Sequence, residues 1–158
     1  MTATAWVAEP REAEAVARLL VAFRDFAGRD WPSENSFLAS VERLLPRIDT
    51  EYLLAAADAD SPPAGVCQLR FRLSVWTAAE DCWLEDLFVA EQARKRGVGG
   101  ALVELALERA RERGCRRIEL DASESNEEAL ALYARFGFSQ HSKSAPPDRD
   151  LFLGVRLE

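Results

Sequence analysis

Two spacings of hydrophobic positions alternate along this chain, and each predicts one kind of element. In the first third, apolar residues recur every three or four positions, as they do along the buried face of a helix. This spacing predicts a helix over residues 10–27, with Gly28 just past its last turn. It predicts a second helix over residues 33–45, which Pro46 terminates. A short apolar run at residues 6–8 precedes both helices and predicts a strand.

The middle of the chain changes to short apolar runs separated by turn residues, a pattern typical of strands. The predicted strands cover residues 52–57, 66–75 and 82–89. Asp, Pro and Gly cluster between the first two runs, at residues 58–65, and predict a turn there. The last two runs follow each other closely enough to predict a hairpin.

Helical spacing returns over residues 97–114, and a short strand is predicted over residues 116–122. A further helix follows, with Ser125 as its expected N-terminal cap and Glu128 as the capping-box partner, ending near Gly137. Closing strands are predicted over residues 138–142 and 151–157. The resulting order of elements is βααβββαβαββ.

Length and composition narrow the class of protein. At 158 residues the chain has the size of one globular domain, so we expect a single α/β domain over residues 1–158, with helices flanking a mixed central sheet. A net charge of −7 excludes a general nucleic-acid-binding protein, because neutralising phosphates requires a surplus of cations. No apolar run approaches the ~20 residues that span a bilayer, and no signal peptide is recognisable. Three cysteines without a CxxC pair predict free thiols in a cytoplasmic protein.

A glycine-rich turn joins the strand at residues 82–89 to the helix that follows it. Glycines let the backbone N–H groups of a helix N-terminus approach an anion closely, and the helix dipole adds positive potential. Neighbouring cations strengthen that potential, so the turn is predicted to cradle a pyrophosphate. Its residues are Arg94, Lys95, Arg96, Gly97, Val98, Gly99 and Gly100.

Two other phosphate-binding turns are excluded by the residues present. A P-loop requires Lys and then Ser or Thr after its glycine, whereas Gly100 is followed by Ala101 and Leu102. A dinucleotide fingerprint requires a third Gly or Ala three residues after Gly99, where Leu102 stands.

Two segments carry a resemblance to a known family. The first reads Arg94-x-x-Gly97-x-Gly99 after Leu87-Phe88-Val89, and the second reads Asn126-x-x-Ala129-x-x-x-Tyr133-x-x-x-Gly137-Phe138. In this order and spacing they resemble the two conserved regions of the GNAT superfamily of acyl-CoA-dependent N-acyltransferases. The strand over residues 84–89 is moreover similar to that of the diamine and polyamine N-acetyltransferases of the spermidine/spermine type.

The resemblance implies the GNAT fold and acetyl-CoA as co-substrate, and it implies where that co-substrate binds. The backbone groups of Leu87, Phe88 and Val89 would pair with the pantetheine arm as if it were an added strand. The turn over residues 95–100 would hold the pyrophosphate, with Arg94 and Arg96 nearby, and Asn126 would contact the co-substrate.

Transfer of an acetyl group requires a neutral amine, so some group must accept a proton from the ammonium form. We expect Glu85 to do so, directly or through water, because a partly desolvated carboxylate beside the co-substrate would have a raised pKa. Asp86 is expected to bind a cationic substrate. A backbone N–H of Phe88 or Val89 would stabilise the oxyanion that forms on the thioester. Tyr133 lies seven residues after Asn126, on the same helix face, and is expected to protonate the departing thiolate.

These residues predict an N-acetyltransferase that acts on a primary amine of a small molecule by direct attack on the thioester. A protein or peptide N-acetyltransferase and a non-catalytic acyl-CoA-binding regulatory protein remain alternatives. His141 has no Asp or Cys neighbours at ligand spacing, so no metal is expected. A homodimer is possible, and no nucleic-acid or membrane partner is predicted.

Overall fold

The computed structural model describes residues 2–140, 145 and 147–157, and these fold around a five-stranded sheet. The strands follow one another across the sheet in chain order. Neighbours are antiparallel from β1 to β4, whereas β4 and β5 are parallel, so the sheet is mixed, as predicted. The strands are β1 (Thr4–Val7), β2 (Thr50–Ala56), β3 (Gly65–Ser74), β4 (Ala79–Val89) and β5 (Ile118–Glu119).

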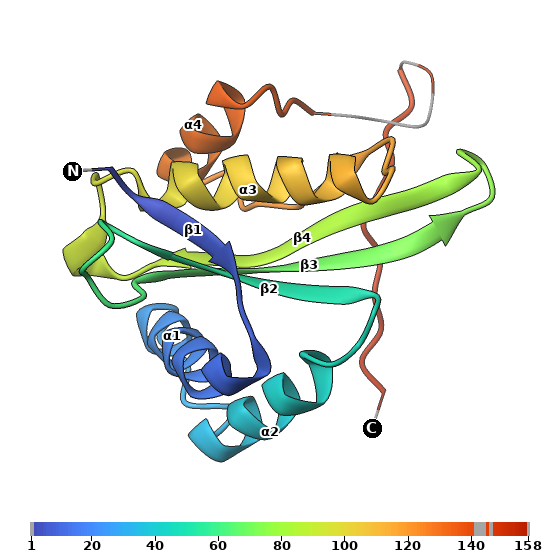
Figure 1. The fold of residues 1–158 in the computed structure, drawn as a ribbon. Helices are drawn as coiled ribbons and strands as arrows, with labels where there is room; N and C mark the ends of the chain where they lie inside the picture. The colour runs from blue at the N-terminus through green and yellow to red at the C-terminus, as the bar shows by residue number, and fades with distance from the viewer. Residues whose placement is uncertain (1, 141–144, 146, 158) are drawn as a thin grey trace.

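Helices cover both faces of this sheet, with α1 and α2 on one face and α3 and α4 on the other (Figure 1). The predicted α/β class is therefore confirmed. The helices are α1 (Ala13–Phe26), α2 (Glu34–Leu44), α3 (Val98–Glu112) and α4 (Glu127–Arg135), and two short 3₁₀ turns are η1 (Pro10–Glu12) and η2 (Glu91–Ala93).

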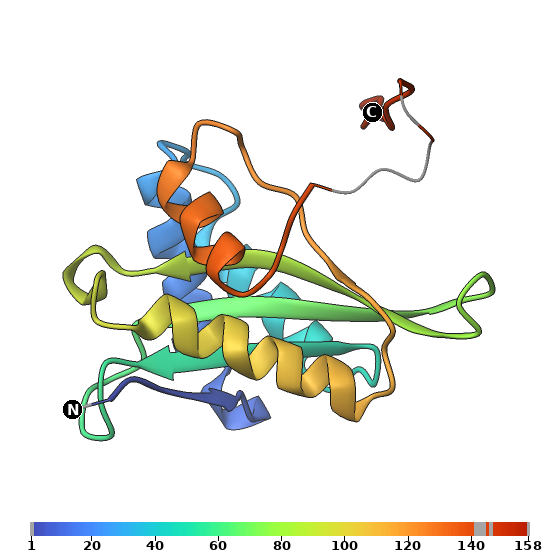
Figure 2. The ribbon, with the colours of Figure 1, turned by 90° about the horizontal axis from the view of Figure 1, so that it is seen from above.

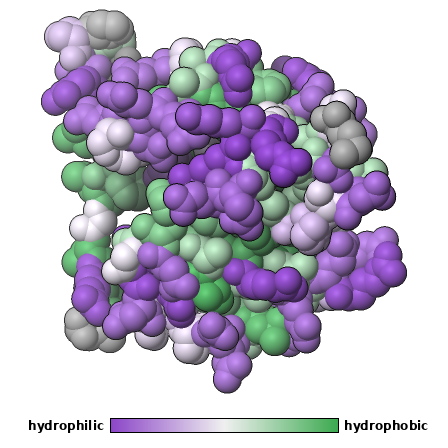
Figure 3. All heavy atoms as spheres, turned by 90° about the vertical axis from the view of Figure 1, so that its left-hand side faces the viewer, coloured by the Kyte–Doolittle hydropathy of each residue, from purple (hydrophilic) through white to green (hydrophobic). Residues whose placement is uncertain are grey.

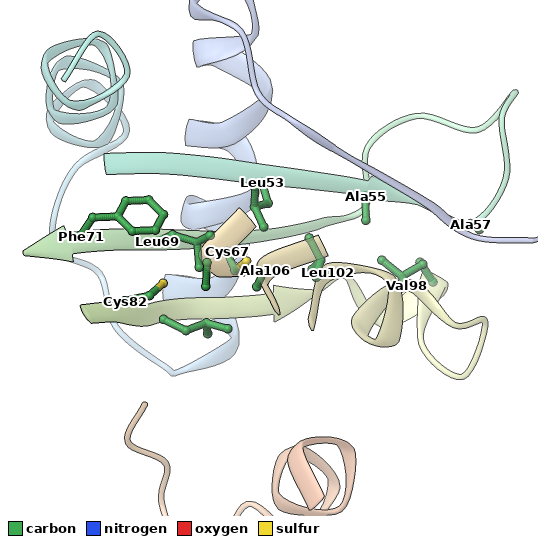
Figure 4. Close-up of a cluster of buried hydrophobic side chains, with 13 residues drawn as sticks. Leu53, Ala55, Ala57, Cys67, Leu69, Phe71, Cys82, Val98, Leu102 and Ala106 are labelled. Carbon is green, nitrogen blue, oxygen red and sulfur yellow. The ribbon is translucent and has the colours of Figure 1, made fainter. Parts of the chain in front are cut away.

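The sheet has a hydrophobic core on each side because successive residues of a strand point to opposite faces. Leu53 and Leu69 belong to the cluster beneath α3, together with Leu102 of that helix (Figure 4). Leu54 and Val66 belong to the second cluster, which includes side chains of α1 and α2. All five side chains are fully buried. A side chain on β3 or β4 therefore faces either α3 or the α1–α2 pair, according to its position in the strand.

The N-terminal cap of α4 differs from the predicted one. Ser125 and Glu128 were expected to form a capping box, but the Asn126 side chain accepts a hydrogen bond from the Ala129 N–H at 3.2 Å. The Ser125 hydroxyl lies instead 2.9 Å from that of Ser123. Ser and Asn cap helices about equally well, so the identity of the residues alone could not choose between neighbouring positions.

The prediction of two closing strands was wrong for the residues described here. Residues 138–140 and 147–157 contain no strand, while residues 141–144, with His141 among them, lie outside the described part of the chain. The strand predicted over residues 116–122 is reduced to the two residues of β5. A strand requires a neighbour for its backbone hydrogen bonds. Residues 151–157 alternate suitably, but they are exposed along their length and pair with no strand of the sheet.

Strand β4 is paired on both sides over only part of its length. It pairs with β5 at Cys82–Ile118 and Trp83–Glu119, and the chain after β5 then turns away towards α4 (Figure 2). From Leu84 to Val89, β4 pairs with β3 alone within the described chain. This leaves one edge of β4 open at the end of the strand that leads into the glycine-rich turn.

Candidate active site

A β-bulge interrupts β4 at the centre of the site. Val66 of β3 pairs with Phe88 and Gln68 pairs with Glu85, so the one residue between them on β3 faces two residues on β4. The first of these two, Asp86, has a φ of 56°, in the left-handed region that Asp tolerates better than most residues. The bulge bends the strand where its open edge begins.

A cleft of about 540 Å³ lies along this open edge. Its walls come from β4, from the turn before α3, from one face of α4 and from the end of α1. Figure 3 faces this side of the molecule and shows an apolar area bordered by hydrophilic residues. The lining residues are Phe23, Phe26, Leu87, Phe88, Val89, Ala93, Arg94, Lys95, Gly97, Val98, Gly99, Gly100, Asn126, Glu128, Ala129, Leu132 and Arg135.

The turn before α3 has the backbone geometry that its glycines predict. Gly97 caps the helix in the left-handed region, at φ 83°, and Lys95 precedes it with φ 61°. No side chain caps this N-terminus, so the first N–H groups of α3 are available to a ligand. Gly99 allows α3 to approach α4 closely, because a Cβ there would lie 3.0 Å from Leu132.

The three cations of the turn have different surroundings. Arg94 Nε donates to the Val89 carbonyl oxygen at 3.1 Å, and its guanidinium lies 4.4 Å from the centroid of the Phe26 ring. Arg96 forms an ion pair with Asp58 at 3.7 Å and lies outside the cleft lining. Lys95 lines the cleft. Arg94 therefore ties the turn to β4 and α1, and Lys95 is the cation of the turn best placed to meet an anion.

Glu85 and Asp86 are adjacent in sequence but differ in their surroundings. Glu85 faces the α1–α2 side, where its Oε2 accepts a hydrogen bond from Arg70 Nε at 3.2 Å. At Asp86, desolvation raises the pKa of the carboxyl group above its ordinary value, and the charge of Glu85 raises it further, against the opposing effect of Arg70. Neither residue lines the cleft, and both lie at the bulge beside it.

Tyr133 lies just behind the α4 wall of the cleft. Its side chain is 8% exposed, its ring packs on Phe138 with centroids 5.7 Å apart, and burial raises its pKa to about 12. Ala129, one helical turn earlier, lines the cleft, whereas Tyr133 does not. The phenol therefore stays protonated at any physiological pH and can act as a hydrogen-bond donor.

The structure brings together ten of the predicted co-substrate residues along the cleft and adds side chains that the sequence reasoning missed. Leu132 and Arg135 continue the spacing of three residues that joins Asn126 to Ala129. Following that spacing further along the helix would have predicted both residues. Phe23 and Phe26 come from α1, far away in the sequence, and Phe23 stacks on Phe88 with centroids 5.1 Å apart. No local signal indicates that tertiary contact. The predicted residues in the cleft are Leu87, Phe88, Val89, Arg94, Lys95, Gly97, Val98, Gly99, Gly100 and Asn126.

Other kinds of site have little support in the described residues. They contain no group of three or more His, Cys, Asp or Glu side chains that could hold a metal ion. Cys67 and Cys82 are buried free thiols, and burial raises the pKa of both, which makes them poor nucleophiles. No helix in the described ranges is long and apolar enough to cross a membrane.

The sheet is mixed, and its bulged strand β4 has one open edge and leads into a glycine-rich turn. These features define an acyl-CoA N-acyltransferase fold. The chain belongs to the Acetyltransferase (GNAT) family, whose family model matches residues 16–138. The structure is similar to the crystal structure of a probable acetyltransferase, with a TM-score of 0.84 and 28% identity over 100% of both chains.

Two curated relatives are similar to this chain in sequence. The D-amino-acid N-acetyltransferase HPA3 of Saccharomyces cerevisiae is 26% identical over 130 residues, which cover 82% of this chain and 81% of that protein. The thialysine N-epsilon-acetyltransferase of Sus scrofa is 30% identical over 84 residues, covering 50% of this chain and 49% of that protein. The protein is therefore an acetyltransferase by family. The match to the thialysine enzyme covers only about half of each chain. The finer resemblance to polyamine-type acetyltransferases is therefore not confirmed.

Proposed function

We propose that this enzyme transfers the acetyl group of acetyl-CoA to a primary amine of a small molecule. One observation carries the proposal: the cleft joins an open strand edge to an uncapped helix N-terminus. An extended amide chain can pair with the edge of Leu87–Val89, and a pyrophosphate fits the N–H groups of the turn. The small amine is supported by the names of both curated relatives, which act on an amino acid and on thialysine.

The co-substrate would be held mainly by backbone groups. The N–H groups of Phe88 or Val89, at the open edge, would stabilise the negative charge that develops on the thioester oxygen. Val98 to Gly100 would supply the N–H donors to the pyrophosphate, and Lys95 adds a charge beside them. Asn126 already caps α4, so its contact with the co-substrate would come from the remaining amide nitrogen.

The acceptor amine would lose one proton to the carboxylates at the bulge. Attack forms the C–N bond and breaks the C–S bond, and the ammonium form of the substrate gives up two protons in all. Glu85, and Asp86 with its raised pKa, would take one proton and pass it to solvent. The other proton ends on the CoA sulfur.

Tyr133 would stabilise the leaving thiolate. Because its pKa is raised to about 12, the phenol is a weaker acid than a thiol, whose ordinary pKa is about 8.5. A hydrogen bond to the thiolate is therefore the role that its pKa favours, with water delivering the proton.

The test is the release of free CoA thiol from acetyl-CoA across a panel of amines: diamines, polyamines, amino acids, aminoglycosides, thialysine and short peptides. We expect turnover with a small-molecule class, and Glu85→Gln should reduce it by about 100-fold. Acetyl-CoA at 100 times its Kd should raise the free energy of unfolding by about 2.7 kcal/mol.

Turnover confined to the peptides would replace the small amine by a protein acceptor. Bound acetyl-CoA with no turnover on any acceptor would instead favour a regulatory protein. The matched control is Glu104→Gln, a change of the same kind on the exposed side of α3, outside the cleft lining.

A further inference from the structure

Three polar side chains form a row across the sheet on the α1–α2 side. Tyr52 of β2 pairs with Gln68 of β3, which pairs with Glu85 of β4. Directly opposite residues on neighbouring strands have Cβ atoms about 4.5–5.5 Å apart, so these three side chains are neighbours on one face of the sheet. The row ends at the bulge, where the acetyl group would be transferred.

Gln68 is unusual within this row because one of its polar atoms lacks a partner. Its side chain is 2% exposed, and Nε2 has no hydrogen-bond acceptor in the described part of the chain. On one side it is flanked on the same face by Leu54 and Val66, which are apolar and fully buried, and on the other by Tyr52 and Arg70. A buried amide donor without an acceptor is uncommon in folded proteins and suggests that a ligand oxygen supplies one.

A cation lies on the same face of the same strand. Arg70 is two residues beyond Gln68, so both side chains point to the α1–α2 side. Arg70 uses Nε for its hydrogen bond to Glu85 and is about half exposed. Its two terminal nitrogens donate no hydrogen bond to any described residue, and a guanidinium fork matches the two oxygens of a carboxylate.

The site thus presents both signs of charge within one strand pair. Glu85 and Asp86 are suited to an ammonium group at the bulge, while the Gln68 amide and Arg70, whose Nε lies 3.2 Å from Glu85 Oε2, are suited to a carboxylate beside it. A diamine or polyamine would place a second cation, or an apolar chain, against Arg70. An α-amino acid carries its amine and carboxylate at the short separation that this arrangement offers.

We propose that the acceptor is an α-amino acid whose carboxylate binds Arg70 and the side-chain amide of Gln68. This inference rests on the proposed N-acetyltransferase function and names its substrate class. Its chemistry is unchanged: the α-amine forms the C–N bond, the C–S bond breaks, one proton leaves through the carboxylates and one ends on sulfur.

The test compares each amino acid with partners that lack only the carboxylate. Both enantiomers of alanine, phenylalanine and lysine are assayed beside the corresponding amino acid amides and decarboxylated amines. We expect kcat/KM to fall at least 30-fold when the carboxylate is removed. Equal turnover of the amines would overturn this inference and leave the small-amine acetyltransferase intact. No turnover with any small amine, with acetyl-CoA bound, would overturn both.

Variants separate recognition from folding. Arg70→Gln should raise KM for the amino acid at least 10-fold, leave KM for acetyl-CoA unchanged and abolish the preference over the decarboxylated amine. Gln68→Met removes the buried donor at similar volume, so it should lower kcat/KM for amino acids while the melting temperature stays level or rises. Arg72→Gln, an exposed change further along β3, is the matched control and should leave the preference intact. Loss of the preference in Arg72→Gln as well would also overturn the assignment to Arg70.

Discussion

Asp86 combines a left-handed backbone conformation with a carboxyl group whose pKa is raised by desolvation. Asn adopts the same conformation readily, so Asp86→Asn removes the charge without disturbing the bulge. Between the ordinary pKa of Asp and the raised one, the native state binds more protons than the unfolded state. Native stability therefore falls as the pH rises through that window and stays lower above it.

We expect Asp86→Asn to be more stable than the wild type at pH 7 and to lose this advantage towards pH 3.5. Thermal melts between pH 3.5 and pH 8 check it, with an expected gain below about 4 °C, the shift that 1 kcal/mol gives in a domain of this size. Asp49→Asn is the control of opposite sign, because hydrogen bonding to Arg47 lowers the pKa of Asp49. A gain in both variants would contradict the explanation.

Tyr133 gives a second prediction for a single residue. Tyr133→Phe removes the hydroxyl and keeps the ring that packs on Phe138. If the phenol bonds the departing thiolate, kcat should fall about 100-fold while KM for acetyl-CoA and the melting temperature change little. Because burial raises the Tyr133 pKa to about 12, the wild-type rate should show no alkaline loss from this group up to pH 10. If kcat of Tyr133→Phe equals that of the wild type, Tyr133 has no role in catalysis and serves only to pack the core.

At the scale of elements, α3 is flanked by glycines in the left-handed region, one at its N-cap and one just beyond its C-cap. Gly97 has φ 83° and Gly114 has φ 76°, and only Gly97 belongs to the cleft. Alanine in this conformation costs about 1–2 kcal/mol at either position. We expect Gly97→Ala and Gly114→Ala to lower the free energy of unfolding alike, and only Gly97→Ala to raise KM for acetyl-CoA. Denaturant unfolding and initial rates measure the two effects, and an equal rise in KM would exclude a specific role for the turn.

The elements also differ in how far the sequence could predict them. The spacing of apolar residues located the helices and the inner strands, because burial on one face forces that spacing on them. The glycine turn was equally predictable, since positive φ angles and close approach restrict which residues can stand there. The end of β5, and the absence of closing strands in residues 138–140 and 147–157, depend on whether a distant segment supplies a pairing partner, which no local pattern encodes. The same holds for the Phe23–Phe88 stack and for the donor left unpartnered at Gln68.

At the scale of the whole molecule, none of residues 149–157 belongs to either hydrophobic core. Residues 149–157 are exposed, several of them large and apolar, and they include no strand. Deleting residues 149–158 should therefore shift the melting temperature by less than about 2 °C and leave acetyl-CoA binding unchanged. Phe138→Ala, which removes a ring packed on Tyr133, should lower the melting temperature more than the deletion does.

Light scattering on the full-length protein and on the variant that lacks residues 149–158 measures the oligomeric state. A homodimer, which the sequence allows, remains a prediction. If the exposed apolar residues mediate association, the deletion should convert a dimer into a monomer, and a full-length monomer would contradict the prediction. A large loss of stability on deletion would mean that the segment packs on the body of the molecule.

The two hydrophobic cores of the sheet have a consequence for the order of events in turnover. The proposed acceptor site at Arg70 and Gln68 lies on the α1–α2 side of the sheet, while the cleft follows the open edge of β4 between α4 and the end of α1. Cys67 and Cys82 are buried, and the partly exposed Cys115 does not line the cleft, so none of these three thiols is placed to store an acetyl group between two half-reactions. We therefore expect both ligands to be bound at once, so that double-reciprocal plots of initial rate at several fixed acceptor concentrations intersect and do not run parallel.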